Sequence, residues 1–139
     1  MATITPKLTI NSTTAITGET LNISVDDTLT VVSPIVGLSV VDAEATSGSL
    51  TTIKPSGSAN QYVYVKHTGY QADGTTATTN QLAVFVEGTD TDGDTNTIET
   101  LRLAAQEFAF FPVMSNKIVK VKSSSTHVVK TEYAYWTAG

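Results

Sequence analysis

Residues 62–87 read YVYVKHTGYQADGTTATTNQLAVFVE, and this stretch decides the fold. Its two ends, residues 62–66 and 82–87, are runs of valine and aromatic residues, which fit the pleated surface of a β-sheet. Between them lies a polar loop, residues 68–80, rich in threonine and glycine, which are common in turns. The stretch therefore predicts two β-strands joined by a loop.

The same pattern extends in both directions along the chain. Strand signals recur about every ten residues with turn residues between them, and no long apolar repeat of helical period interrupts them. Only residues 98–107 have tolerable helix propensity. The further predicted strands are residues 7–12, 21–25, 29–32, 38–42, 50–54, 98–103, 107–113, 117–122 and 128–136. We therefore expect an all-β fold, an antiparallel β-sandwich that is jelly-roll-like or immunoglobulin-like, with eight to ten strands and little or no helix.

Length and composition narrow the class of protein. The 139 residues suit a single domain, residues 1–139, and threonine occupies 25 of them. Residues 1–7 carry few apolar groups, which favours an extended N-terminal arm over a core strand. The absence of cysteine excludes disulfides, thiolate catalysis and the usual structural zinc sites.

Charge and hydropathy limit the partners. The net charge is −5, and the eight basic residues form no patch that could hold a nucleic acid against phosphate repulsion. The first residues lack a basic stretch followed by an apolar run, so we expect no signal peptide. Apolar runs are far too short to cross a bilayer, so we expect no membrane partner.

One acidic loop resembles part of a calcium site. Carboxylates stand at the first, third and fifth positions of such a loop, Asp90, Asp92 and Asp94. The sixth position, which needs glycine, is Thr95, and the twelfth, which needs a bidentate glutamate, is Leu101. We therefore expect a polar hairpin loop in which Gly93 has a positive φ, with no bound metal; the three aspartates are the weak candidate ligands.

No arrangement of residues indicates catalysis. His67 and His127 are sixty residues apart, and we expect both to be exposed at loop edges. No serine lies in a nucleophile elbow, and the glycines are dispersed singly instead of forming a phosphate-binding loop. We expect no catalytic residue, no cofactor and no enzymatic activity.

The strongest candidates for an interface are aromatic and basic residues in the last third of the chain. These are Phe108, Phe110, Phe111, Tyr133, Tyr135, Trp136, Lys120 and Lys122. Alternation places Phe108 and Phe110 on one face of a strand with Phe111 on the other, and sets Tyr133 and Tyr135 opposite Trp136. Strands that are apolar on both faces lie in a core, our main expectation, or are covered by another chain. The two lysines lie on the solvent face of a strand, where they protect a sheet edge or pair with an acidic partner subunit.

The second half of the chain resembles small β-structured virion proteins of tailed bacteriophages. Residues 62–69 (YVYVKHTG) are similar to a "YVYVKNTG" strand of that group, and residues 103–112 (LAAQEFAFFP) to a "Leu-x-x-Gly-Glu-Phe-x-Phe-x-Pro" strand. Residues 132–136 (EYAYW) are similar to its terminal "Glu-Tyr-x-x-Trp/Phe" strand. The chain departs from the pattern at Gln106, where the group has glycine, so the turn before Glu107 can differ.

This resemblance implies a β-sandwich that assembles on a capsid or in a tail, with no catalytic residue. Two functions follow as expectations. The first is a capsid decoration or cement protein, assembled in the host cytoplasm, that binds the major capsid protein or another virion protein as a symmetric oligomer, with a trimer favoured. The second is a tail or fibre module that recognises a host surface glycan, for which residues 70–80 offer one tyrosine, one aspartate and one asparagine.

Overall fold

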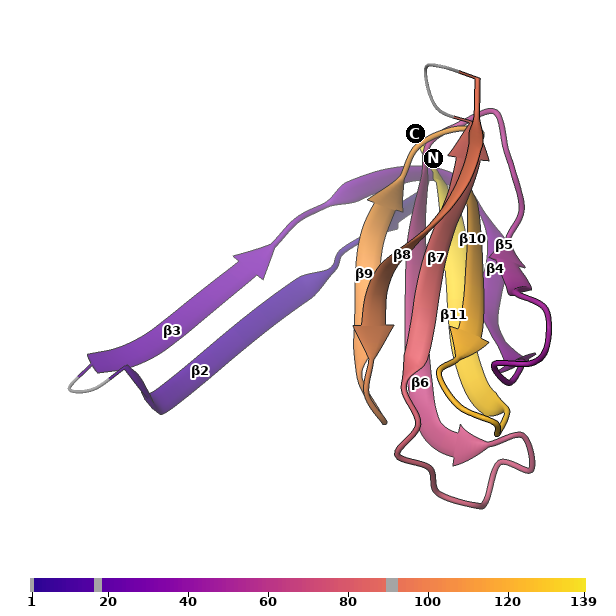
Figure 1. The fold of residues 1–139 in the computed structure, drawn as a ribbon. Helices are drawn as coiled ribbons and strands as arrows, with labels where there is room; N and C mark the ends of the chain where they lie inside the picture. Colours follow the sequence, from indigo (N-terminus) through magenta and orange to yellow (C-terminus); the bar gives the residue numbers. More distant parts are fainter. Residues whose placement is uncertain (1, 17–18, 90–92) are drawn as a thin grey trace.

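Two antiparallel sheets pack face to face into a β-sandwich in the computed structural model of the chain (Figure 1). One sheet has five strands in the order β1–β4–β11–β6–β9, and the other has four in the order β5–β10–β7–β8. A third sheet, the two-stranded hairpin β2–β3, projects away from the sandwich (Figure 1). The all-β antiparallel sandwich predicted from the sequence is confirmed.

The structure describes residues 2–16, 19–89 and 93–139, with the side chains of all but 14–16, 19 and 33–36 among them. Within these residues there are eleven strands and no helix. The strands are β1 (Ala2–Ile4), β2 (Lys7–Ile16), β3 (Glu19–Asp26), β4 (Leu29–Ala43), β5 (Thr51–Lys54), β6 (Gln61–Gln71), β7 (Leu82–Thr89), β8 (Thr95–Leu103), β9 (Phe108–Val113), β10 (Ile118–Ser123) and β11 (Val129–Ala138). This is one strand more than the upper limit of the expected eight to ten.

The core lies between the two main sheets and is built from alternate residues of their strands. Residues 61–69 of β6 alternate between buried and half-buried positions, and β10 does the same along its whole length. Valine fills half of these inward positions, and its branched side chain packs well on a pleated surface. The buried cluster comprises Ala43, Ile53, Val63, Val65, Leu82, Val84, Leu103, Val113, Val119, Val121, Val129 and Tyr135.

The structure differs from the predicted strands in the first third of the chain. Residues 29–32 and 38–42, predicted as two strands around a bend, belong to the single strand β4. Its pairing with β11 absorbs the irregularity through register shifts between Tyr133 and Ala138. Residues 2–4, predicted within an extended N-terminal arm, form β1 and pair with residues 29–31 of β4. The segment that extends from the sandwich is β2–β3 instead.

The turn that enters β9 holds Gln106 in a backbone conformation that favours glycine. Gln106 has a φ of 70°, the left-handed conformation that glycine adopts without strain. The Glu107 N–H donates to the Ala104 carbonyl (3.0 Å) and closes the turn, and the Gln106 N–H donates to the His67 carbonyl (3.0 Å). The glycine-like turn geometry is therefore present, held by hydrogen bonds to β6 and with a side chain attached.

Candidate functional site

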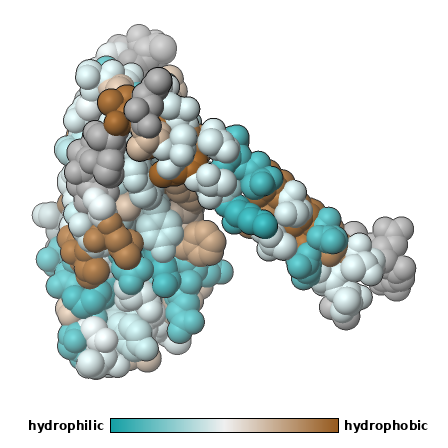
Figure 2. Space-filling view, turned by 180° about the vertical axis from the view of Figure 1, so that it is seen from behind, coloured by the Kyte–Doolittle hydropathy of each residue, from teal (hydrophilic) through white to brown (hydrophobic). Residues whose placement is uncertain are grey.

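The hairpin β2–β3, hereafter the arm, has one aliphatic face and one polar face. Residues directly opposite each other in an antiparallel pair project from the same side of the sheet. The aliphatic face is formed by the pairs Leu8–Val25 and Ile10–Ile23, followed by Ser12–Leu21, and the polar face by Lys7–Asp26, Thr9–Ser24 and Asn11–Asn22. The hydrophobic surface along the arm is visible in Figure 2.

The aliphatic face of the arm is open to solvent. The exposed fractions are 56% for Val25, 50% for Leu8, 42% for Ile10 and 40% for Ile23. A two-stranded hairpin has no second layer, and alone it is marginally stable in water. A regular row of aliphatic side chains left in this state is typical of a surface that another molecule covers.

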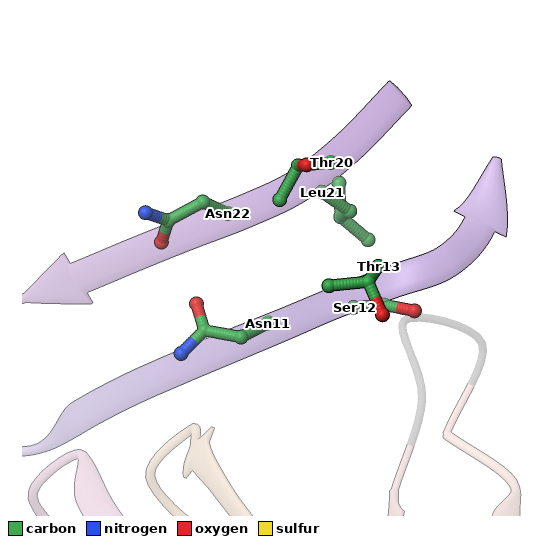
Figure 3. A pocket seen from close by; sticks show the side chains of 6 residues that line it. All are labelled: Asn11, Ser12, Thr13, Thr20, Leu21 and Asn22. Atoms are coloured by element: carbon green, nitrogen blue, oxygen red, sulfur yellow. The ribbon is translucent and has the colours of Figure 1, made fainter. Parts of the chain in front are cut away.

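The outer half of the arm carries a shallow polar hollow (Figure 3). It is lined by Asn11, Ser12, Thr13, Thr20, Leu21 and Asn22. Asn11 and Asn22 come from paired positions of the two strands. Among the residues whose side chains the structure describes, this lining offers hydrogen-bonding groups and no titratable side chain.

A second apolar surface covers the outer face of the five-stranded sheet. This aromatic face consists of Tyr62 and Tyr64 of β6, Phe108 and Phe110 of β9, and Trp136 of β11. The rings of Tyr62 and Phe110 stack with centroids 5.9 Å apart. Phe108 lies 6.3 Å from Tyr64, and Phe110 lies 6.3 Å from Trp136. Phe108 is 61% exposed, so it does not belong to the core.

The predicted division of the aromatic residues between two faces is confirmed. Phe111 packs against the core cluster on the inner side of β9, opposite Phe108 and Phe110. Tyr135 is buried in the cluster, and Tyr133 packs against it. Burial raises the pKa of Tyr135, and the nearby Tyr133 contributes a smaller increase. The core therefore takes three of the six aromatic candidates, and the outer face takes the other three.

The arm and the aromatic face meet in one apolar groove of about 500 Å³. It is lined by Pro6, Lys7, Leu8, Val25, Asp27, Phe108, Ala109 and Phe110. A neighbouring hollow of about 280 Å³ continues it toward Tyr64 and Trp136. Leu8 and Val25, at the root of the arm, therefore face the same space as the aromatic rings. The two apolar surfaces are continuous.

The charged groups on the outer face pair with one another. Lys66 Nζ lies 3.8 Å from a carboxylate oxygen of Glu132, and Lys130 Nζ donates to Asp42 Oδ1 at 2.9 Å. Burial raises the pKa of Tyr64, and the negative charge of Glu132 raises it further. The surface beside the aromatic rings is thus neutral on balance, with the exposed Leu38 and Val40 of β4 extending it.

The structure corrects one interpretation of Lys120 and Lys122. Both lie on the outer side of β10, as predicted, but β10 runs between β5 and β7 and is not a sheet edge. Lys120 Nζ donates to a carboxylate oxygen of Glu87 on β7 at 2.7 Å. This hydrogen bond, with a second from Thr97, lowers the pKa of Glu87. Protection of an edge is therefore wrong for these lysines, and contact with a partner subunit stays a prediction.

The acidic loop lies between β7 and β8, and the structure describes its second half. Asp90 and Asp92 lie outside the described residues, whereas Asp94 lies within them. Gly93 has a φ of 90°, which confirms the predicted positive φ. Within residues 2–16, 19–89 and 93–139, no three histidine, aspartate or glutamate side chains come together in a group that could hold a metal ion.

His67 is buried, which corrects the expectation that both histidines are exposed. Its Nδ1 accepts the Gly69 N–H at 2.9 Å, so Nε2 carries the proton and donates to the Asn80 carbonyl at 2.7 Å. The ring therefore fastens the two ends of the loop between β6 and β7. The sequence already indicated this burial. Side chains alternate between the two faces of a strand, so residue 67 lies on the same inward face as Val63 and Val65. His127 is exposed, as expected.

Lys54 is a buried cation that sequence reasoning missed. It ends the short strand β5, its side chain is fully buried, and its Nζ donates to the Lys117 carbonyl. Burial lowers the pKa of this amine. The contact is structural, since it joins β5 to the turn before β10.

Comparisons with known proteins identify no relative. No protein-family model, no curated protein and no solved structure matches the chain. In the part of the chain that the structure describes, no helix is long and apolar enough to span a membrane.

Proposed function

We propose that this chain is a non-enzymatic structural subunit that functions by assembling on a tailed-bacteriophage particle, as a capsid decoration or cement protein. The single observation that carries the proposal is the projecting arm, with its aliphatic face 40–56% exposed at four positions. The partners would be the major capsid protein or another virion protein, together with further copies of the chain in a symmetric oligomer, with a trimer favoured.

The energetics support an assembling protein. Complete burial of a leucine, isoleucine or valine side chain contributes about 1.5–3 kcal/mol relative to full exposure. The arm carries a row of such side chains that are about half exposed. At the root of the arm, Phe108 and Phe110 of the aromatic face add further apolar surface. A complex in which another molecule covers both surfaces is therefore stabilised by a large free energy of apolar burial. Many copies on one particle would then hold firmly through individually weak contacts, because each further contact forms at high effective concentration.

A specific observation favours a second function, recognition of a host surface glycan. Tyr62 and Phe110 present two stacked rings on an exposed sheet face, and Trp136 lies beside them. Flat aromatic faces of this kind can pack against the apolar side of a sugar ring. The candidate glycan surface is then the aromatic face, and not residues 70–80.

Attachment to particles tests the proposal. Particles lacking the protein would be mixed with purified wild-type chain, sedimented, and the bound chain quantified against the major capsid protein. We expect saturable binding in proportion to the capsid protein. The double variant Ile10→Thr/Ile23→Thr, on the aliphatic face, should lose this binding. The matched control Thr9→Ser/Ser24→Thr, on the polar face, should keep it.

Two results would contradict the proposal. One is wild-type chain that binds no particle. The other is binding of a soluble oligosaccharide that depends on Trp136 while the arm variant behaves as wild type, which would transfer the function to glycan recognition.

A further inference from the structure

We infer that the arm of one copy packs its aliphatic face on the aromatic face of a second copy of the same chain, so that neighbouring copies exchange arms. The inference rests on the proposed function, because it names the first partner in the assembly. It assigns the groove at the root of the arm as the place where the two copies meet.

The arm cannot cover the aromatic face of its own chain. Its root is fixed where the Asp27 N–H donates to the Pro6 carbonyl at 3.3 Å, and from there the arm leaves the sandwich (Figure 1). Of the described aliphatic pairs of the arm, only Leu8–Val25 lines the groove beside Phe108 and Phe110. Ile10 and Ile23 lie farther along the arm, beyond the lining of the groove. They therefore need cover from another molecule.

The two surfaces match in size. The eight residues of β3 span about 27 Å at 3.3–3.4 Å per residue, and five strands spaced about 4.8 Å apart place the axes of the two outermost strands about 19 Å apart. The arm is thus long enough to cross the whole outer face of the five-stranded sheet. Each surface lacks the second layer that a β-sheet with an apolar face normally packs against. When the two surfaces pack together, the arm is the second layer for the aromatic face, and the aromatic face is the second layer for the arm.

The charged residues of the two faces are compatible with contact between them. The aliphatic face of the arm carries no charged residue along the pairs Leu8–Val25, Ile10–Ile23 and Ser12–Leu21. On the aromatic face, Lys66 pairs with Glu132 in its own sheet and needs no partner from outside. The groove at the root of the arm adds one positive and one negative side chain, Lys7 and Asp27, so two copies of the chain bring opposite charges in equal number to this meeting place.

The buried area favours a second copy over an unrelated protein. An arm about 27 Å long and 10 Å wide covers roughly 300 Å², so a contact with one foreign surface buries roughly 600 Å² on the two sides together. Specific interfaces bury about 1,200–2,000 Å². Exchange between copies gives every chain two such contacts, one through its arm and one through its aromatic face. When two copies exchange arms reciprocally, both contacts join the same pair of chains and their interface reaches roughly 1,200 Å², at the lower limit of that range, whereas in a ring of three copies each pair shares roughly 600 Å².

Trp136 makes the inference directly testable, because it is the only tryptophan in the chain and belongs to the aromatic face. Acrylamide quenching of its fluorescence would be measured over a range of protein concentrations, with the mass followed by sedimentation velocity. We expect the mass to rise with concentration to that of a closed oligomer, and the quenching constant to fall several-fold over the same range.

Variants connect this protection to the arm. Ile10→Thr/Ile23→Thr should stay monomeric with fully quenchable Trp136, whereas Thr9→Ser/Ser24→Thr should behave as wild type. Because threonine substitutions could also unfold the arm, a second variant replaces residues 8–25 by the turn dipeptide Asn-Gly between Lys7 and Asp26. It removes the arm altogether and should likewise be monomeric with exposed Trp136.

Two other outcomes contradict arm exchange, and a third separates it from the proposed function. A wild-type oligomer whose Trp136 stays fully quenchable would place the arms elsewhere, for example against one another. A wild-type chain that is monomeric at every concentration yet attaches to particles would overturn the exchange and leave the proposed function standing. An oligomer with protected Trp136 that attaches to no particle would support arm exchange and overturn the proposed function.

Discussion

The sandwich and the arm are built from the same kinds of residue but bury them very differently. Core side chains of the sandwich are at most 6% exposed, whereas Leu8, Ile10, Ile23 and Val25 of the arm are at least 40% exposed. Both regions alternate β-branched with polar residues, and both pair antiparallel. The difference is that the sandwich has two layers and the arm has one. Alternation therefore tells which side chains share a face, and topology decides whether that face is covered.

Truncating one aliphatic side chain in each region should give the largest contrast. Leu82→Ala should lower the free energy of unfolding by about 2–5 kcal/mol, because the side chain is fully buried and leaves a cavity. Ile23→Ala should cost less than about 1 kcal/mol in the monomer, since its side chain is already 40% exposed. Urea denaturation at low protein concentration measures both. Equal losses would mean that the arm is already covered within a single chain.

The buried amine of Lys54 should make the stability of the sandwich depend on pH. Its folded pKa is lowered below the ordinary 10.5, so between those two values the unfolded chain binds more protons and stability rises with pH. Lys54→Met lacks this contribution. The unfolding free energy of wild type minus that of Lys54→Met should therefore increase as the pH is raised from 7 to 10.5. If this difference in unfolding free energy is constant over the range, the pKa of Lys54 is not lowered by burial in the sandwich.

Removing the arm should leave the stability of the sandwich almost unchanged. In the variant with residues 8–25 replaced by Asn-Gly, we expect an unfolding free energy within about 1 kcal/mol of monomeric wild type, because only the pair Leu8–Val25 borders the groove. Far-ultraviolet circular dichroism and urea denaturation check this. A variant that is fully unfolded would show that the arm stabilises the sandwich as well as extending from it.

The smallest effect is expected at the turn between β8 and β9. Gln106→Gly relieves a left-handed backbone and gives greater freedom to the unfolded chain, so the net change should be only a few tenths of a kcal/mol, favouring the folded state. Asn116→Gly is the matched control, because Asn116 also has a positive φ (62°) but asparagine tolerates it better. Gln106→Gly should therefore stabilise more than Asn116→Gly. The opposite order, measured by thermal denaturation, would mean that the Gln106 side chain makes a net favourable contact.

The sequence predicted much of the sandwich because alternation is a local property. Strands β6, β7, β9 and β10 were all expected, and so was the division of Phe108 and Phe110 from Phe111. The single strand β4 was missed because Pro34 and Gly37 are typical of a bend, and only pairing with β11 shows that the strand continues. Residue 67 could have been assigned to the core by extending the alternation of β6 two positions further.

The candidate site was less predictable, since it depends on which strands meet. Residues 7–12 and 21–25 were expected as strands, and nothing in their pattern distinguishes an arm from two members of the sandwich. Tyr62 and Tyr64 were expected in a strand, but their contact with Phe110 and Phe108 follows from the pairing of β6 with β9. That pairing joins strands far apart in the chain, which local pattern does not reveal.

The place of β11 in the sheet has a consequence for biosynthesis. It is the last strand in the chain, yet it lies between β4 and β6 and joins the pair β1–β4 to the pair β6–β9. Lys130 of β11, for example, bonds to Asp42 of β4, 88 residues earlier. Until β11 leaves the ribosome, both halves of the sheet have an open edge, although the arm can close early from neighbouring residues. A nascent chain is therefore prone to aggregate until β11 has been made, and a chain truncated before residue 129 has no means of closing the sheet.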